Sequence, residues 1–110
     1  MKKVKIAVFG SLIYDSMCWG PRLPKKGETI CGYRNGFYTG GKGANQAVQA
    51  AKLGAEVYMI GKIGDDEPGK IIRKTIEGYG VNTDYLITGK GENSGCCVIM
   101  VDDNGDNAIM

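Results

Sequence analysis

The sequence contains no histidine, and this absence excludes several kinds of site at the outset. A Ser-His-Asp triad and a histidine-ligated metal centre both need an imidazole, so these 110 residues can build neither. Long hydrophobic runs are also missing, since the apolar run from Val4 to Phe9 is too short for a membrane span or a secretory leader. We therefore expect no membrane partner and a cytoplasmic protein.

The chain also lacks an excess of one charge and a spaced set of cysteines. Its 14 basic and 12 acidic residues are scattered, with no basic stripe, so we expect no nucleic-acid partner. Cys18, Cys31, Cys96 and Cys97 do not have the C-x-x-C-like spacing of zinc ligands, and no secretion signal favours disulfides. We expect free thiols and assign no metal ligand.

Alternating strand and helix patterns predict an α/β fold with a parallel sheet. The predicted strands are Val4–Phe9, Val57–Ile60 and Asp84–Thr88. One predicted helix has an inner stripe of Ala44, Ala47, Val48 and Ala51 before Gly54, and the next starts at Asp65-Asp66-Glu67-Pro68 with the stripe Ile71, Ile72, Thr75, Ile76 and Tyr79.

Two further segments have sequence patterns that predict a small antiparallel sheet. Asp15–Tyr38 consists of short mixed pieces broken by glycine and proline. Cys96–Val101 is predicted as a strand with apolar residues on both faces, and Asn104-Gly105 predicts a hairpin with a return strand over Asp106–Met110. Such a strand needs two partners, so we expect one face to cover a ligand and the other to meet a second subunit.

Eighteen glycines are the main excess, and three of them surround Lys42. Gly40-Gly41-Lys42-Gly43-Ala44-Asn45 lets the backbone turn and approach a ligand, while Lys42 and Asn45 supply donors where a helix start has unpaired N–H groups. Gly36–Lys42 fits the start of a P-loop, but Gly43 stands where the Mg²⁺-binding hydroxyl belongs, so we reject that interpretation. A plain glycine-rich turn remains the alternative.

For the other candidate residues, the residues alone favour a structural role over a functional one. Asp15 follows the first strand and could accept two hydroxyl hydrogen bonds, or simply cap a turn. Asp65 and Asp66 could suggest a metal, but their place before Pro68 favours helix capping. Cys97 and Ile99 share one face of a strand and are core residues by default.

The combination of these motifs resembles the N-terminal part of the ribokinase-like (PfkB) carbohydrate kinase family. The resemblance runs from Val4 to about Met110, and within the family the ribokinase branch is the most similar. It rests on Gly40-Gly41-Lys42-Gly43-Ala44-Asn45-Gln46-Ala47, then Gly54, then Gly64-Asp65-Asp66 and Gly69.

The resemblance implies a ribokinase-like parallel sheet with flanking helices and a small β lid, incomplete in this chain. Residues 1–110 would be the N-terminal part of one such domain, with lid segments at about 15–38 and 94–110. The implied activity is transfer of the ATP γ-phosphate to a sugar hydroxymethyl group. ATP, Mg²⁺ and a monovalent cation such as K⁺ would bind mainly outside this segment, and a homodimer would form through the lid.

The resemblance also assigns roles to individual residues. It implies sugar binding by Asp15, Gly41, Lys42 and Asn45, with Cys97 and Ile99 pointing toward the sugar. Gly40 and Gly43 lie where the lid rejoins the core and would serve as hinges.

Two departures from the family pattern matter. Ile13 stands where ribokinases usually have Asn, which puts ribose in doubt because buried hydroxyl-binding groups discriminate strongly. The family's Gly-Ala-Gly-Asp motif, which holds the catalytic base, is not in these residues, so we assign no catalytic residue and expect the segment alone to be inactive. The alternatives are a non-catalytic sugar-binding or dimerisation fragment, and a nucleoside kinase of the same family.

Overall fold

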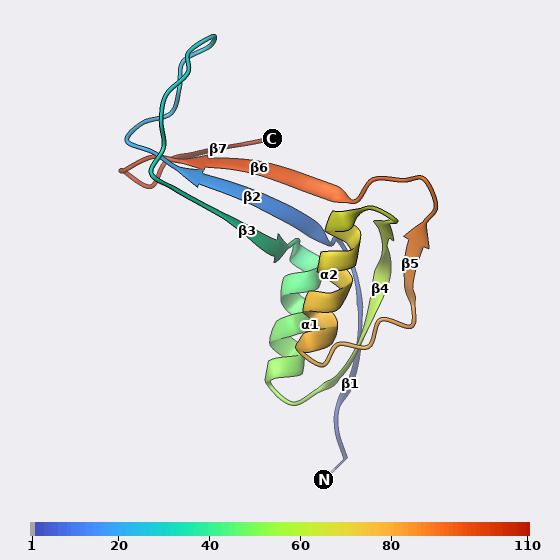
Figure 1. Cartoon of the computed structure of the whole chain (residues 1–110). Helices are drawn as coiled ribbons and strands as arrows, with labels where there is room; N and C mark the ends of the chain where they lie inside the picture. The colour runs from blue at the N-terminus through green and yellow to red at the C-terminus, as the bar shows by residue number, and fades with distance from the viewer. Residues whose placement is uncertain (1) are drawn as a thin grey trace. The chain divides into compact units, whose positions relative to one another are not determined.

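The computed structural model describes residues 2–110, which form two β-sheets and two helices (Figure 1). In chain order the elements are β1 Lys5–Phe9, β2 Ile13–Trp19, β3 Arg34–Gly40, α1 Lys42–Lys52, β4 Glu56–Gly64, α2 Glu67–Gly78, β5 Leu86–Gly89, β6 Gly95–Val101 and β7 Asn107–Ile109. One sheet has the strand order β1-β4-β5 and the other has the order β3-β2-β6-β7. Neither described helix is long and apolar enough to cross a membrane.

The chain divides into two compact units. The first unit runs to Tyr14 and resumes over Thr39–Gly95, and the second consists of Asp15–Tyr38 with Cys96–Met110. The first unit therefore contains the sheet β1-β4-β5 with both helices, and the second contains most of the other sheet.

The sheet of the first unit is parallel throughout, as the alternating pattern predicts. β1 pairs with β4 in the register Val8 to Met59, and β4 pairs with β5 in the register Ile63 to Thr88. Both helices lie on the same side of this sheet (Figure 1). Between them and the strands lies the hydrophobic core, whose largest fully buried side chains are Met59, Ile72, Ile76 and Val57.

Helix α1 lies close to the sheet because its inner face is made of small residues. Ala44 and Ala47 are completely buried, and Val48 and Ala51 pack against the core beside them. The helix is followed by Gly54, whose φ of 95° is the left-handed conformation that the sequence predicts for a residue just past a helix end. The predicted stripe is confirmed.

Helix α2 starts at the predicted place but presents a narrower apolar stripe. Ile72 and Ile76, one turn apart, are fully buried. Ile71 and Tyr79 are exposed, so their prediction as inner residues is wrong. They flank the Ile72–Ile76 line rather than lie on it, and the Tyr79 ring instead carries the Lys52 ammonium group 4.7 Å from its centroid.

Asp66 caps α2 and also holds the loop that follows β5. Its Oδ1 accepts hydrogen bonds from the Gly69 N–H at 2.9 Å and the Ser94 hydroxyl at 2.6 Å, and its Oδ2 accepts from the Ser94 N–H at 2.8 Å. The Ser94 Oγ in turn accepts from the Gly64 N–H at 2.9 Å. The hydrogen bonds from Ser94, with that from Gly69, hold the pKa of Asp66 below its usual value. Helix capping is therefore confirmed as its role.

Replacing Asp66 with alanine should lower the denaturant midpoint of unfolding, because one cap bond and both bonds to Ser94 are lost. Chemical denaturation measures this change, with Glu67→Ala, an exposed residue of the same helix turn, as the control. Since the pKa is lowered in the folded state, the contribution of Asp66 is present above the usual aspartate pKa and is lost as the pH falls below it. Equal losses for the two variants would contradict this role.

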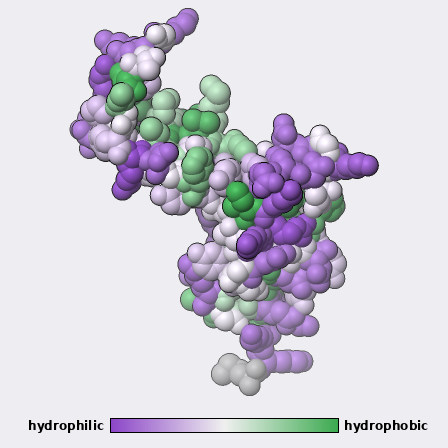
Figure 2. All heavy atoms as spheres, in the orientation of Figure 1, coloured by the Kyte–Doolittle hydropathy of each residue, from purple (hydrophilic) through white to green (hydrophobic). Residues whose placement is uncertain are grey.

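The second unit contains the predicted hairpin. β6 and β7 are antiparallel, with Ile99 opposite Ile109. In the turn, the Asp102 carboxylate accepts hydrogen bonds from the N–H groups of Asn104 and Asp106 at 2.9 and 3.0 Å. Figure 2 shows hydrophobic side chains gathered over the strands of this unit.

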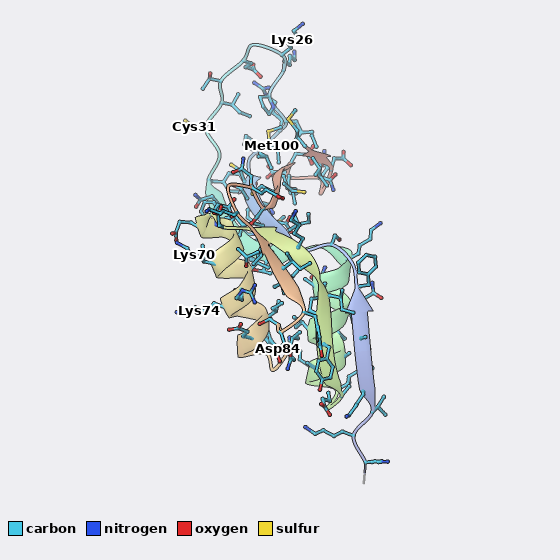
Figure 3. All side chains as sticks on the ribbon, turned by 90° about the vertical axis from the view of Figure 1, so that its right-hand side faces the viewer. Lys26, Cys31, Lys70, Lys74, Asp84 and Met100 are labelled. Atoms are coloured by element: carbon cyan, nitrogen blue, oxygen red, sulfur yellow. The ribbon has the colours of Figure 1, made fainter. Side chains whose placement is uncertain are left out.

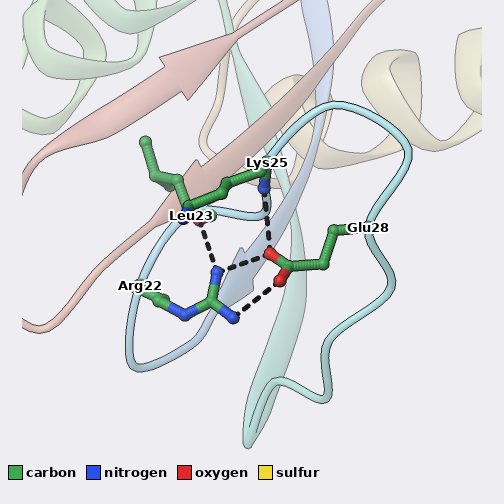
Figure 4. A network of polar contacts seen from close by, with 4 residues as sticks. All are labelled: Arg22, Leu23, Lys25 and Glu28. Atoms are coloured by element: carbon green, nitrogen blue, oxygen red, sulfur yellow. Dashed lines mark hydrogen bonds and ion pairs between the residues drawn. The ribbon is translucent and has the colours of Figure 1, made fainter.

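The long connection between β2 and β3 is held by one bidentate ion pair. The Arg22 guanidinium donates to both oxygens of Glu28, at 2.5 and 2.9 Å, and the Lys25 N–H adds a third bond to the same carboxylate (Figure 4). The Arg22 hydrogen bond lowers the pKa of Glu28 to about 2. The connection thus contains a charge-assisted contact between its own residues, at a solvent-exposed position.

Candidate functional site

The turn that enters α1 requires glycine at Gly41. This residue is the N-cap of α1 and has a φ of 92°, a conformation that side chains with a Cβ rarely adopt. A Cβ built there would lie 2.7 Å from the Ser11 carbonyl oxygen and 3.0 Å from the Ile13 nitrogen. The glycine therefore permits both the turn and the close approach of the β1–β2 connection.

Gly43 has a different reason to be glycine. It lies in the first turn of α1, is buried, and faces the backbone of Gly10 and Ser11. A Cβ on Gly43 would lie 2.6 Å from the Gly10 carbonyl carbon, and one on Gly10 would lie 2.9 Å from the Gly43 Cα. Because neither glycine has a side chain, the backbone at the start of α1 packs directly against the backbone that follows β1. A hinge role for Gly43, and for Gly40 at the end of β3, stays a prediction.

Ser11 occupies part of the helix terminus that the sequence analysis left open for a ligand. Its Oγ accepts a hydrogen bond from the Lys42 N–H at 3.1 Å, and its carbonyl oxygen accepts from the Ala44 N–H at 3.0 Å. The Asn45 N–H already bonds the Gly41 carbonyl at 2.9 Å. The N–H groups of Lys42 and Ala44, which no helix carbonyl can satisfy, are thus paired within the chain, and the expectation that they are unpaired is wrong for these two groups. The only sequence signal for the pairing of Ser11 with α1 is its position, directly after the first strand and Gly10.

The side chains of Lys42 and Asn45 remain available for a ligand. Both residues are exposed, and within residues 2–110 neither side chain has a hydrogen-bond partner. Asn45 lines a hollow of about 320 Å³, together with Thr39, Ala44, Val48, Gln49, Lys52, Thr75 and Tyr79. An ammonium group and an amide at the start of one helix are suitable donors to the hydroxyl groups of a polar molecule.

The second unit brings the other predicted residues together. The half-buried Asp15 carboxylate on β2 accepts a hydrogen bond from the Cys97 thiol on β6. Burial raises the pKa of Asp15 above its usual value, and the Cys97 bond opposes that rise. Ile99 lies two residues beyond Cys97, so it shares the face of β6 with that thiol. In apolar surroundings a carboxylate can accept strong hydrogen bonds from hydroxyl groups.

The predicted site residues therefore form two groups. Gly41, Lys42 and Asn45 belong to the first unit, and Asp15, Cys97 and Ile99 belong to the second. A further residue that the sequence analysis singled out, Ile13, is half-buried, and a Cβ on Gly95 would meet its Cδ1 at 2.7 Å. Its aliphatic side chain thus packs against the first residue of β6.

A third cluster of polar side chains, on α2, has a structural explanation. Lys70 and Lys74 project from the helix (Figure 3), and Lys70 pairs with Glu67 at 2.9 Å. The Arg73 guanidinium donates to the Leu86 carbonyl and the Thr88 hydroxyl, both at 2.9 Å, and so fastens the helix to β5. In the described part of the chain, no group of three or more acidic or cysteine residues could hold a metal ion.

Comparison with known proteins places these features in a family. The family model described as pfkB family carbohydrate kinase matches residues 3–110. The ribokinase of Bacillus subtilis is 44% identical over 105 residues, which are 96% of this chain and 36% of that protein. The deoxyribokinase of Salmonella typhi is 40% identical over 105 residues, covering 96% of this chain and 34% of that protein.

A solved structure gives the same result for the fold. The structure of Arabidopsis thaliana ribokinase complexed with ribose and ATP superposes with a TM-score of 0.86 at 38% identity, covering 100% of this chain and 36% of that one. The chain thus spans about a third of the length of the relatives it matches. With the family match extending over nearly all of its residues, the chain belongs to the pfkB family of carbohydrate kinases.

Proposed function

We propose that this chain is the sugar-binding and lid part of an ATP-dependent sugar kinase that phosphorylates a sugar hydroxymethyl group. The observation that carries the proposal is the match of nearly its whole length to about a third of the length of ribokinases, one of which has been solved with ribose and ATP. The Asp15–Cys97 pair and the Lys42–Asn45 turn add groups that suit hydroxyl recognition.

Each group of residues has a distinct role in this proposal. Ionised Asp15 accepts hydrogen bonds from two neighbouring hydroxyls, while Cys97 and Ile99 provide an apolar wall beside it. Lys42 and Asn45 donate to further hydroxyls, and Gly41 lets the sugar approach the backbone. When bound, ATP supplies the phosphoryl group, and the residues of this chain orient the hydroxymethyl group that receives it.

Phosphorylation by the full-length gene product tests the proposal. A panel of ribose, deoxyribose, fructose and nucleosides, each with ATP and Mg²⁺, should yield phosphate transfer to at least one sugar. ADP release that depends on the sugar is the measurement. Absence of turnover with every compound, from a protein that is folded by circular dichroism, would contradict the proposal.

As the pH is lowered, the affinity for the sugar should begin to weaken at a higher pH than it would if Asp15 had the pKa of an ordinary aspartate. The raised pKa of Asp15 means that its carboxylate protonates early as the pH falls, and the neutral acid loses its acceptor strength. The stability of the sugar-free protein has the opposite sign: a raised folded pKa favours the folded state at low pH, and this contribution is lost as the pH rises through that pKa. Calorimetric titration of the sugar across pH 4–7 measures the first effect. An affinity profile that Asp15→Asn leaves unchanged would contradict it.

The same residues are compatible with two alternative functions. The first alternative is a non-catalytic sugar-binding or dimerisation fragment, for which the Asp15–Cys97 pair and the exposed Val98 of β6 would suffice. A specificity other than ribose is favoured by Ile13, whose aliphatic side chain packs on Gly95 where an amide could bond a hydroxyl, and by the identity to a deoxyribokinase. Sugar binding without turnover would select the first alternative, and preference for deoxyribose or a nucleoside would select the second.

We further propose Mg²⁺ and a monovalent cation such as K⁺ as cofactors, a homodimer formed through the lid strands, and a cytoplasmic location. The apolar residues on both faces of β6 support the dimer, since one of them, Val98, is exposed. The four free thiols suit a reducing compartment. Sedimentation of the full-length protein as a monomer at high concentration would contradict the dimer.

A further inference from the structure

A hollow of about 320 Å³ lies between the two helices of the first unit. Helices α1 and α2 are neighbours on one side of the sheet (Figure 1), and residues of both line the hollow. Ala44 and Val48 of α1 form its apolar floor, and the other lining residues are polar: Thr39, Asn45, Gln49, Lys52, Thr75 and Tyr79. Its volume is at the lower end of the range of about 300–1,000 Å³ that is typical of ligand pockets, so its size suits a small molecule.

The amide and ammonium groups around this hollow are not used by the fold. Within residues 2–110 the side-chain amides of Asn45 and Gln49 have no hydrogen-bond partner, and the ion pairs all involve residues other than Lys52. The Lys52 ammonium group instead lies 4.7 Å from the centroid of the Tyr79 ring. A ring face attracts a cation without taking up its N–H groups as ordinary hydrogen-bond donors, so these donors remain available to a ligand.

The charge of the lining residues decides which kind of ligand fits. Lys52 is the one charged residue among them, so a cation would be repelled and the ammonium group of an amino acid would find no carboxylate. A phosphate dianion is usually held by an arginine fork or by the free N–H groups of a helix start. No arginine lines the hollow, and the Lys42 and Ala44 N–H groups at the start of α1 already bond Ser11. The single ammonium group matches the single charge of a carboxylate.

The uncharged polar groups of the lining suit hydroxyl groups on the same ligand. The two amides and the hydroxyls of Thr39 and Tyr79 can each donate to a hydroxyl or accept from one. We infer that this hollow binds a small monocarboxylic acid that carries hydroxyl groups, with its carboxylate on Lys52 and its hydroxyls on Gln49 and Asn45. Asn45 is the one residue that the hollow shares with the proposed sugar-binding residues, so the hollow is a second binding site of the chain.

Calorimetric titration of the full-length gene product with glycerate tests this inference. Propionate, which lacks the hydroxyl groups, and glycerol, which lacks the carboxylate, are matched probes with the same number of carbon atoms. We expect glycerate to bind at one site, at least about fivefold more tightly than either probe. Equal affinities for the three compounds would overturn the inference. Displacement of glycerate by inorganic phosphate at the same concentration would also overturn it, because the site would then prefer a phosphate.

Variants of the exposed Lys52 show whether glycerate binds in the hollow. Lys52→Met keeps the aliphatic stem but removes the charge, so it should weaken glycerate binding about five- to tenfold, whereas Lys52→Arg should keep most of the affinity. Lys74, an exposed lysine that projects from α2 and does not line the hollow (Figure 3), gives the control Lys74→Met, which should leave the affinity unchanged. Unchanged affinity in Lys52→Met, or an equal loss in Lys74→Met, would overturn the inference.

A variant of Gln49 tests the recognition of the hydroxyl groups. Gln49→Leu should lower the affinity for glycerate to about that for propionate and leave the affinity for propionate unchanged, because only the hydroxyl contacts are lost. Full affinity for glycerate in this variant would overturn the assignment of the hydroxyls. Binding of glycerate by a protein that phosphorylates no sugar would still support the inference, which therefore does not depend on the proposed function.

Discussion

Replacing Asp15 with asparagine in the complete protein is expected to lower kcat/KM for the sugar by about 10²–10⁴-fold. The carboxylate is half-buried beside Cys97 and is proposed to accept two hydroxyl hydrogen bonds. A hydrogen bond to a charged group contributes about 1.5–3 kcal/mol, and two such bonds give this range. The amide keeps the shape of the side chain but loses its charge and replaces one acceptor oxygen with a donor.

The sugar-dependent loss should appear without a loss of stability. Burial already disfavours the charged form of Asp15, so the neutral amide removes that penalty and the midpoint of unfolding should hold or rise. Asp106→Asn, which changes an exposed carboxylate of the β6–β7 turn, is the control and should retain full activity. Steady-state kinetics with the preferred sugar would contradict the role of Asp15 if the two variants behaved alike.

Replacing Gly43 with alanine should destabilise the protein by about 3 kcal/mol. The new methyl group would lie 2.6 Å from the Gly10 carbonyl carbon and 2.7 Å from the Ser11 nitrogen. Both are backbone atoms, so they cannot move aside as a flexible side chain would. The start of α1 must separate from β1, which weakens the hydrogen bonds from Lys42 and Ala44 to Ser11. Denaturant unfolding of the complete protein measures the loss.

Gly78 offers a control of the same chemistry in the other helix. A Cβ built on Gly78 meets no atom within 4 Å, and the residue lies at the end of α2. Gly78→Ala should therefore stabilise the protein by up to about 1 kcal/mol through its better helix propensity. Unfolding midpoints that shift in the same direction for both variants would show that packing against Gly10 is not what requires Gly43.

The elements were predictable because each carries a local signal. The small residues Ala44 and Ala47 recur at helical spacing, and Asp66 before Pro68 marks a helix start that the structure confirms. The exposure of Ile71 and Tyr79 was not predictable from spacing. Which apolar residue of a helix lies inward depends on how the helix is rotated against the sheet, and that is settled by partners far away in the sequence.

The site was predictable as residues but not as contacts. The glycine-lysine turn and Asp15 stand out because glycine excess and an isolated carboxylate are visible in the sequence alone. The hydrogen bond from the Lys42 N–H to the Ser11 hydroxyl joins residues 31 positions apart, and the Asp15–Cys97 bond joins two strands of the second unit. Tertiary contacts of this kind follow from the packing of sheets, which one sequence does not encode in any local pattern.

The two serines that bond across the first unit have a mechanical consequence. The chain passes between its units after Tyr14, after Tyr38 and after Gly95. Ser11 and Ser94 are tied down by hydrogen bonds just before the first and last of these passages. Three residues, Leu12 to Tyr14, separate Ser11 from the first passage, and Gly95 alone separates Ser94 from the last. Two serine hydroxyl groups thus fix the first unit close to two of the three points where the chain leaves or enters it.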